Sequence, residues 1–261
     1  MLRILFIGDI VGRPGRKAVK RELQSLIASE ELDLVIANGE NAAGGFGITL
    51  EVTRELLAAG VDVITMGNHT WDNRDITNVL EHESRVIRPA NYPKGTPGQG
   101  YYIAETEKGF LVGVVNLLGL VFLDALRCPF EAAEELVNQL KKKTDLIIID
   151  FHAEATSEKV ALGWFLDGRV SAVLGTHTHI TTADERILPR GTGYITDVGM
   201  TGPINSVLGI DPELVITKFR TKRPVRFEVA EGPIALNCIL LELDEFGKTT
   251  AIRRIRRVIE E

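Results

Sequence analysis

Short apolar runs alternate with segments of helical periodicity from the start of the chain, and this alternation limits the possible fold more than any other feature. Buried-type strands followed by amphipathic helices are typical of βα units, whose strands pair in parallel. The expected strands are residues 2–7, 33–37, 61–66, 86–90, 146–150, 170–174 and 194–197, and the expected helices are residues 16–29, 50–58, 130–142 and 157–167. The sequence therefore predicts an α/β fold.

Two further regions favour antiparallel pairing. Residues 101–106 and 110–117 flank Lys108 and Gly109 and are expected to form a hairpin. Residues 225–230, 235–243 and 249–258 are expected to pair near the C-terminus. The chain has no linker-like stretch and no repeat of fixed period, and its 261 residues suit one large α/β domain. We therefore expect a single domain over residues 1–261.

Composition and charge narrow the classes of protein to which this chain can belong. The net charge of -6 disfavours a broad basic face for nucleic acid, although bound metal ions would still allow a small anionic substrate. Cys128 and Cys238 form no paired motif, which indicates a reducing compartment. The start lacks a signal-peptide pattern, and no stretch approaches the ~20 apolar residues that span a bilayer. We expect a soluble, cytoplasmic protein that does not enter a membrane.

Polar clusters follow five of the expected parallel strands, at the point where each strand ends. In open α/β sheets, ligand sites form at this edge. The clusters contain Asp9, Glu40 with Asn41, Asn68 with His69, His152, and His177 with His179. Four of the five histidines of the chain are therefore expected close together. Imidazole and carboxylate together favour Fe, Mn, Zn or Ni, and the set is large enough for two ions.

Each of these residues taken alone has a simpler explanation. Asp9 could cap the next helix, and Asn38 with Gly39 could form only a turn. His177 and His179 are two residues apart, so a regular strand would point both to one face, whereas a loop could also bring them together. Chance does not readily place four histidines after strands, so the joint pattern favours a metal site.

The ordered motifs resemble those of the calcineurin-like metallophosphoesterases, and more closely those of the YmdB-type branch. The resemblance rests on Gly8-Asp9, Asn-Gly-Glu-Asn at 38–41, Gly-Asn-His-Thr-Trp-Asp at 67–72, Asp-Phe-His-Ala-Glu-Ala-Thr-Ser-Glu-Lys at 150–159, Gly-Thr-His-Thr-His at 175–179 and Asp-Val-Gly-Met-Thr-Gly at 197–202. It runs from the N-terminus to about residue 209. Val11 stands where the wider superfamily has a histidine, and Glu40 where it has an aspartate. The YmdB-type branch is similar at both positions.

The resemblance implies a fold, a set of ligands and a mechanism. The implied fold is an α/β sandwich of two mixed β-sheets flanked by helices. One ion would be held by Asp9, Asn41 and His179, a second by Asn68, His152 and His177, and Glu40 would bridge them. The ions would be two divalent transition metals, with Fe or Mn favoured and Zn as an alternative. A hydroxide shared by the ions would attack the phosphate. His69, left without a metal, would act as the general acid or donate to the phosphoryl oxygens.

The activity implied by the resemblance is hydrolysis of phosphodiesters, with 2′,3′-cyclic nucleotides as the favoured substrates. Two alternatives stay open. A phosphomonoesterase or nucleotidase would use the same metal centre, and a regulatory scaffold protein with a vestigial site would depend on partner binding instead. The presence of every expected ligand and of His69 disfavours the scaffold.

Contacts to the substrate are less constrained by the sequence. Phe46, in a glycine-rich loop, could stack on a base or fold against the surface, and Thr201 and Gly202 could donate hydrogen bonds to a phosphate. Asp72 could orient His69. The basic run at residues 253–257 raises the question of RNA contact, but a solvated strand face explains it better. The native metals, the physiological substrate and the formation of a homo-oligomer are left open.

Overall fold

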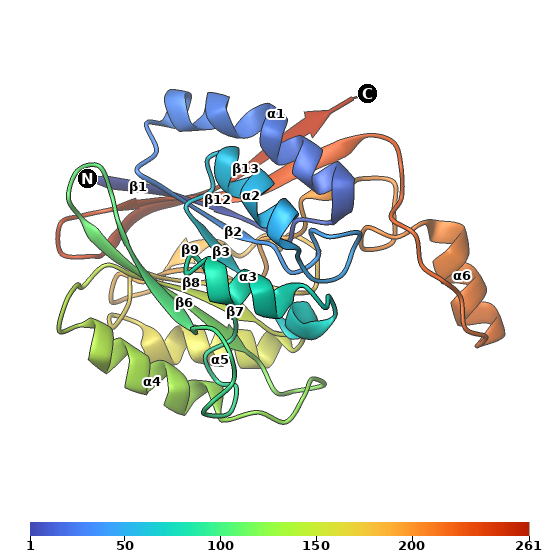
Figure 1. The fold of residues 1–261 in the computed structure, drawn as a ribbon. Helices are drawn as coiled ribbons and strands as arrows, with labels where there is room; N and C mark the ends of the chain where they lie inside the picture. The colour runs from blue at the N-terminus through green and yellow to red at the C-terminus, as the bar shows by residue number, and fades with distance from the viewer. Residues whose placement is uncertain (261) are drawn as a thin grey trace.

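Two mixed β-sheets stack face to face, and helices cover the outer face of each (Figure 1). This arrangement is that of a computed structural model, which describes residues 1–260. The predicted α/β sandwich of two mixed sheets flanked by helices is therefore confirmed. The single domain stays a prediction. Within the described part of the chain, no helix has both the length and the apolar character needed to cross a membrane.

The first sheet combines the N-terminal strands with the C-terminal hairpin. Its order is β11 (Gly202–Pro203), β12 (Ile234–Leu243), β1 (Leu2–Ile7), β2 (Leu34–Asn38), β3 (Val63–Thr65) and β4 (Val86–Ile87), with β13 (Thr249–Ile259) paired to β12. Strands β1 to β4 are parallel, and β12 is antiparallel to both β1 and β13, which confirms the predicted C-terminal pairing of the last two strands. The helices on this sheet are α1 (Gly12–Glu30), α2 (Leu50–Ala58) and α3 (Ile76–His82).

The second sheet comes from the middle of the chain. Its order is β5 (Tyr101–Glu105), β6 (Leu111–Leu118), β7 (Ile147–His152), β8 (Ala172–Thr176), β10 (Gly193–Ile195) and β9 (Arg186–Ile187). Strands β6, β7, β8 and β10 are parallel, whereas β5 and β6 form the predicted antiparallel hairpin. The outer face of this sheet is covered by α4 (Pro129–Leu140) and α5 (Thr156–Leu166).

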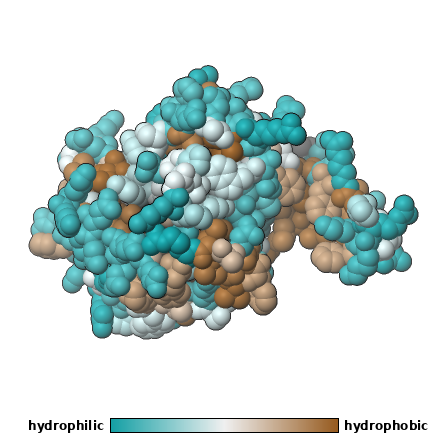
Figure 2. All heavy atoms as spheres, turned by 60° about the horizontal axis from the view of Figure 1, so that its bottom comes forward, coloured by the Kyte–Doolittle hydropathy of each residue, from teal (hydrophilic) through white to brown (hydrophobic). Residues whose placement is uncertain are grey.

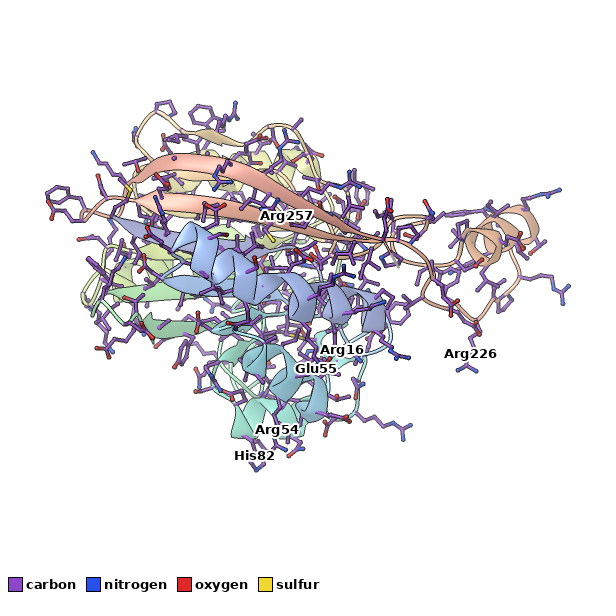
Figure 3. All side chains as sticks on the ribbon, turned by 90° about the horizontal axis from the view of Figure 1, so that it is seen from above. Arg16, Arg54, Glu55, His82, Arg226 and Arg257 are labelled. Atoms are coloured by element: carbon purple, nitrogen blue, oxygen red, sulfur yellow. The ribbon has the colours of Figure 1, made fainter. Side chains whose placement is uncertain are left out.

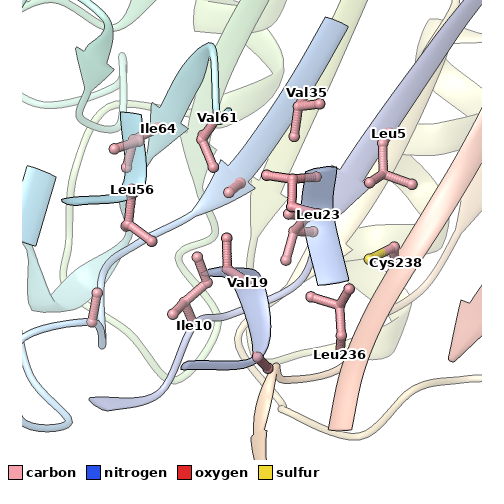
Figure 4. Packing of buried hydrophobic residues seen from close by; sticks show 14 of the residues in the cluster. Leu5, Ile10, Val19, Leu23, Val35, Leu56, Val61, Ile64, Leu236 and Cys238 are labelled. Carbon is pink, nitrogen blue, oxygen red and sulfur yellow. The ribbon is translucent and has the colours of Figure 1, made fainter. Parts of the chain in front are cut away.

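Three layers of buried apolar side chains hold the sheets and helices together. The first layer joins α1, α2 and the first sheet through residues such as Val19, Leu56 and Leu236 (Figure 4). The second layer lies between the two sheets, and the third lies under α4 and α5. Because burial of apolar surface contributes ~25 cal/mol per Å², these layers are the main source of stability.

The layer between the sheets changes from apolar to polar where the parallel strands end. Side chains two residues apart in a strand share a face. The apolar positions Ile36, Val63, Ile148 and Leu174 are therefore followed on the same face by Asn38, Thr65, Asp150 and Thr176, all fully buried. Burial raises the pKa of Asp150 to about 6, although its hydrogen bonds to Thr65 and Thr176 oppose this shift. The polar end of the layer supports the site at the strand ends.

The prediction of a strand at residues 225–230 is wrong. Val229 forms a single β-bridge to Ile210, and the segment contains no other strand pairing. Its alternating apolar residues instead run beside α6 (Pro212–Thr221), a helix that the periodicity did not predict. Asp211 caps this helix by accepting hydrogen bonds from the backbone N–H groups of Glu213 and Leu214, and Pro212 occupies its first turn.

Candidate metal centre

The ends of parallel strands from both sheets bring all seven predicted ligand residues together. Asp9 follows β1, Glu40 and Asn41 follow β2, Asn68 begins the short 3-10 helix η1 (Asn68–Trp71) after β3, His152 ends β7, and His177 and His179 follow β8. Asp9 and His152 are fully buried, and Glu40 is 1% exposed. The placement agrees with the edge expected from the sequence, and the role of these residues as ligands stays a prediction.

His152 Nε2 lies at the centre of the first group of polar atoms. It is 2.9 Å from Glu40 Oε1, 2.9 Å from Asn68 Oδ1 and 3.0 Å from His177 Nδ1. Glu40, His152 and His177 present ligand atoms that all lie within 4.8 Å of one another. A single ion could therefore reach atoms from β7 and from the loops after β2 and β8.

A second group of polar atoms lies beside the first. His179 Nε2 is 3.2 Å from Asn41 Oδ1, and Asp9 Oδ1 is 3.7 Å from His152 Nδ1. Asp9 Oδ2 accepts a hydrogen bond from the backbone N–H of His177, but Oδ1 is buried and has no hydrogen-bond partner among the described residues. A buried carboxylate oxygen without a partner is costly. A cation at this position would remove that cost.

The outer nitrogen of each imidazole is fixed by a hydrogen bond away from the centre. His177 Nε2–H donates to Glu154 Oε2 over 2.9 Å, and His179 Nδ1–H donates to the Leu208 carbonyl over 3.0 Å. His152 Nδ1–H donates to Thr176 Oγ1 over 2.9 Å, because the threonine hydroxyl donates its own proton to Asp150. The second nitrogen of each ring then faces the centre, where it can bind a cation, as in metal sites whose outer residues orient the ligands.

The donor set fits divalent metal ions. Carboxylate oxygen, amide oxygen and imidazole nitrogen atoms lie about 3 Å from one another, so one cation could contact several of them. Gly67 provides the space, because a Cβ at this position would overlap Glu40 Oε2 and His152 Nε2. No described cysteine belongs to the group, so the set contains only nitrogen and oxygen ligands.

The same crowding shifts the pKa values of the group. Burial opposes charge on His152, but Glu40, Asp9 and Asp150 outweigh burial and raise its pKa to about 9. Burial also opposes charge on Glu40, yet the attraction of His152 lowers its pKa to about 2. For His177, burial and the neighbouring positive His152 act together and lower the pKa to about 3. Burial raises the pKa of Asp9. The buried carboxylates of Asp9 and Glu40 therefore favour a positive charge at the centre.

The loop that carries His177 and His179 is held in a strained conformation. Because β8 ends at Thr176, the loop explanation for the two histidines holds rather than the regular strand. The φ angles of His177 and His179 are 99° and 65°, in a region that non-glycine residues seldom occupy. Asp197 fixes this loop by accepting from the backbone N–H and the hydroxyl of Thr178, and Lys159 Nζ donates to the same carboxylate over 2.7 Å.

His69 lies beside the centre with its own hydrogen-bond partner. Its Nδ1–H donates to Asp72 Oδ2 over 2.7 Å, which is the contact expected of a residue that orients it. The backbone N–H of His69 donates to Glu40 Oε2 over 3.0 Å. The Phe46 ring packs edge-on against the His69 ring at 5.0 Å, and 40% of Phe46 stays exposed. Phe46 therefore contacts the protein through His69 and still offers surface to a ligand.

Comparison with known proteins places these residues in a family. The chain matches the family described as "YmdB-like protein" over residues 5–255. It belongs to the YmdB-like family. The resemblance to the YmdB-type branch is thereby confirmed. The chain is 50% identical over 258 residues to the Bacillus subtilis 2′,3′-cyclic-nucleotide 2′-phosphodiesterase, covering 99% of this chain and 97% of that protein.

Solved structures of similar proteins share the fold over the whole chain. A hypothetical protein from Thermus thermophilus superposes with a TM-score of 0.93 at 44% identity, covering 100% of both chains. A novel phosphatase from Mycoplasma pneumoniae superposes with a TM-score of 0.92 at 39% identity, covering 100% of this chain and 94% of that one. The arrangement of the strand ends is therefore supported by experimental structures of relatives.

In this YmdB-like chain, Thr201 and Gly202 pack next to Asp9. Thr201 is fully buried, its hydroxyl donates to the Asn237 carbonyl, and Gly202 is buried in β11. Both lie behind Asp9, whose carbonyl accepts from the Thr201 backbone N–H. The hydrogen bonds from Thr201 and Gly202 to a phosphate stay a prediction. Their packing supports Asp9.

Two residues at the centre were not singled out by the sequence. Glu154 follows His152 by two residues and holds His177, and the Leu208 carbonyl holds His179. Glu154 could have been found, because an acidic residue just after a strand-end histidine is a common orienting partner. The Leu208 contact joins residues 29 positions apart through a backbone atom, so no residue type signals it.

Proposed function

We propose that this protein is a metal-dependent phosphoric ester hydrolase that cleaves phosphodiesters, with 2′,3′-cyclic nucleotides as its substrates. The observation that supports the proposal best is the convergence of Asp9, Glu40, Asn41, Asn68, His152, His177 and His179, with one carboxylate oxygen left buried and unpartnered. The Bacillus subtilis relative, at 50% identity, is named for this activity. The small phosphodiester substrate follows from the same relative.

We assign two metal ions to the centre, Fe or Mn in preference to Zn. Asp9, Asn41 and His179 would hold one ion, Asn68, His152 and His177 the other, and Glu40 would contact both. When bound, the ions would supply positive charge to the phosphoryl oxygens and acidify water at neutral pH. Glu40 Oε1 and Oε2 face different neighbours, His152 and His69, which suits a carboxylate shared between two positions.

His69 would hold the proton that the leaving oxygen needs. Asp72 accepts from Nδ1–H and so fixes the ring. In the imidazolium form, the second proton, on Nε2, passes to the ribose oxygen as its bond to phosphorus breaks, and neutral His69 keeps its Nδ1–H. The hydrogen bond from the His69 backbone to Glu40 sets the distance between this proton and the metal ligands. Phe46, beside His69 and half exposed, is the aromatic side chain placed to contact the base of a nucleotide.

The test combines metal analysis with two substrates. Purified protein is expected to contain about two transition-metal ions per chain, and to hydrolyse 2′,3′-cAMP faster than p-nitrophenyl phosphate. Glu40→Gln is expected to remove both metal and turnover, and Glu81→Gln, at an exposed position on α3, is the matched control.

Other outcomes would change the function assigned to the protein. Two ions with monoester turnover alone would make the protein a phosphatase, the description given to the Mycoplasma pneumoniae relative. Absence of bound metal and of turnover after reconstitution with Fe or Mn would reject the proposed enzymatic function and favour the alternative of a regulatory scaffold protein.

A further inference from the structure

An arm formed by residues 207–230 extends from the edge of the molecule where the parallel strands end (Figure 1). It consists of α6 and the two segments that flank it. Backbone hydrogen bonds from Asp211 to Glu228 and from Ala230 to Gly209 join the two flanking segments into a stem. Val215 is the only buried residue of α6, so the helix owes little of its position to the core.

The stem of the arm adjoins the candidate metal centre. The Leu208 carbonyl accepts from His179 Nδ1 over 3.0 Å. Val229, on the other side of the stem, packs against Gly12, the first residue of α1, and Gly45, in the loop that follows Asn41. A ligand that leaves the centre on this side therefore meets the arm.

The arm carries a concentrated positive charge on an acidic protein. Lys218, Arg220, Lys222, Arg223 and Arg226 are all exposed, and no acidic residue interrupts residues 214–227. The chain as a whole has a net charge of -6. None of the five forms an ion pair with another described residue, and Arg226 extends from the arm into solvent (Figure 3). Unpaired cations on a projecting element attract polyanions.

Apolar and aromatic side chains are interleaved with these cations. Phe219 is 68% exposed and Ile216 is 50% exposed. Lys218 lies over the Phe227 ring at 4.6 Å, and Lys222 lies 5.8 Å from the Phe219 ring centroid. Figure 2 shows the arm standing apart from the body, with hydrophobic atoms next to the hollow between them and hydrophilic atoms at the outer end. Cations that follow a backbone and aromatic rings that stack on bases are the features of single-strand binding.

We propose that the arm binds the chain of a single-stranded RNA whose 3′ end lies in the metal centre. This inference rests on the proposed function and narrows it, because the substrate becomes an RNA ending in a 2′,3′-cyclic phosphate rather than a free mononucleotide. The terminal ring phosphate enters the centre, and the upstream phosphates contact the lysines and arginines of the arm. A helix of this length spans about 15 Å, enough to follow a few nucleotides. Five basic residues with no acidic residue among them suit the uniform negative charge of a phosphate backbone better than a protein surface, where charges of both signs alternate.

The test compares a labelled ten-nucleotide RNA ending in a 2′,3′-cyclic phosphate with 2′,3′-cAMP. Wild-type protein is expected to have a lower KM for the RNA, and added salt should raise the RNA KM more steeply than the KM for 2′,3′-cAMP. The triple variant Lys218→Gln, Lys222→Gln and Arg223→Gln is expected to raise the RNA KM by about tenfold or more and to change the 2′,3′-cAMP KM by less than about twofold.

The matched control removes the same charge elsewhere. Lys141, Lys142 and Lys143 are exposed and lie shortly before β7, at the opposite edge of the second sheet from the arm. Changing all three to Gln should leave both KM values as in the wild type. Equal KM values for RNA and 2′,3′-cAMP in the wild type, or equal effects of the two triple variants, would overturn the proposal.

Two further measurements distinguish this proposal from failure of the proposed function and from an interface between copies of the chain. Fluorescence anisotropy with the same RNA carrying a 3′-hydroxyl measures binding without turnover. Arm-dependent binding in a protein that hydrolyses neither ester would keep the arm and reject the proposed function. Sedimentation velocity tests whether the arm instead contacts a second copy of the chain. If the triple variant of the arm dissociates an oligomer and leaves RNA binding unchanged, the arm is an interface between copies. That result would overturn the RNA proposal.

Discussion

The candidate metal centre and the arm lie at the same edge of the molecule but are built in opposite ways. At the centre, Asp9, Glu40 and His152 are buried, and every imidazole that faces inward is held by a partner behind it. On the arm, the five basic side chains are exposed and form no ion pair with described residues. Fixed geometry suits catalysis, which depends on fractions of an ångström, whereas exposed charge suits the attraction of a ligand. Substitutions should therefore act on turnover at the centre and on affinity at the arm.

Among changes at the centre that keep the metal, the largest expected effect is the loss of the proton donor. His69→Ala should lower kcat for 2′,3′-cAMP by about 10²- to 10⁴-fold, because general acid catalysis contributes that much. Elemental analysis should show the metal content of the wild type, since His69 is not among the proposed ligands. His82→Ala, at the exposed end of α3, should leave kcat unchanged. Loss of metal in His69→Ala would make His69 a ligand and remove its assignment as the acid.

A smaller but still large effect is expected from the buried ion pair beneath the histidine loop. Lys159 and Asp197 are 1% and 0% exposed, so Lys159→Met leaves a buried carboxylate without its cation. Breaking such a pair costs about 3–5 kcal/mol. The free energy of unfolding, from urea denaturation, should fall by that amount, and Lys142→Met on the surface should change it by less than about 0.5 kcal/mol.

A double variant that restores the charge balance separates the contribution of the ion pair to stability from its contribution to metal affinity. Lys159→Met combined with Asp197→Asn should recover part of the stability and little of the metal affinity, because Thr178 would lose its carboxylate acceptor. Full recovery of metal affinity in the double variant would show that Asp197 does not hold the loop.

The contact between Glu154 and His177 predicts a moderate effect on metal binding. Glu154→Gln weakens the acceptor for His177 Nε2–H, and such orienting residues contribute about 10- to 100-fold to metal affinity. Competition with a chelator at fixed pH measures this affinity directly. Glu158→Gln is an unsuitable control because Glu158 binds the backbone of Leu120 and Val121, so Glu134→Gln on α4 is used instead. An affinity within about twofold of the wild type would exclude Glu154 from the support of the centre.

The smallest effect is expected on the stability of the arm. Phe219 is 68% exposed, so Phe219→Ala should change the free energy of unfolding by no more than about 0.5 kcal/mol. If RNA stacks on this ring, the same change should weaken RNA binding by about fivefold or more. A large loss of stability would show that the arm is packed more firmly than its exposure indicates, and the contrast between the two regions would weaken.

The strands and the position of the site were predictable because they depend on local pattern. Apolar runs such as residues 2–7 and 146–150 indicated the strands, and the polar residues that follow them indicated the edge at which the site lies. The helix α6 carried a start signal in Asp211 and Pro212, but its apolar residues do not mark one buried face. Residues 225–230 alternate as a strand would, yet they have only one bridge partner to pair with.

The details of the centre were not predictable from local pattern. The left-handed conformations of His177 and His179 depend on Asp197 and Leu208, which are distant in the chain. The burial of Thr201 depends on packing against Asn237. The order of the motifs indicated the candidate ligand residues, and the family resemblance implied their division between two ions, which stays a prediction.

The hydrogen bond between His179 and Leu208 has a consequence for how ions at the two proposed metal positions would exchange with solution. His152 is held by Thr176 of β8 and His177 by Glu154 in the loop after β7, whereas His179 is held by the stem of the arm. An ion bound by Asp9, Asn41 and His179 would therefore depend on the stem, and opening of the stem would release this ion before its neighbour. Brief exposure to a chelator should then yield a long-lived half-loaded protein, with one ion per chain removed quickly and the other slowly.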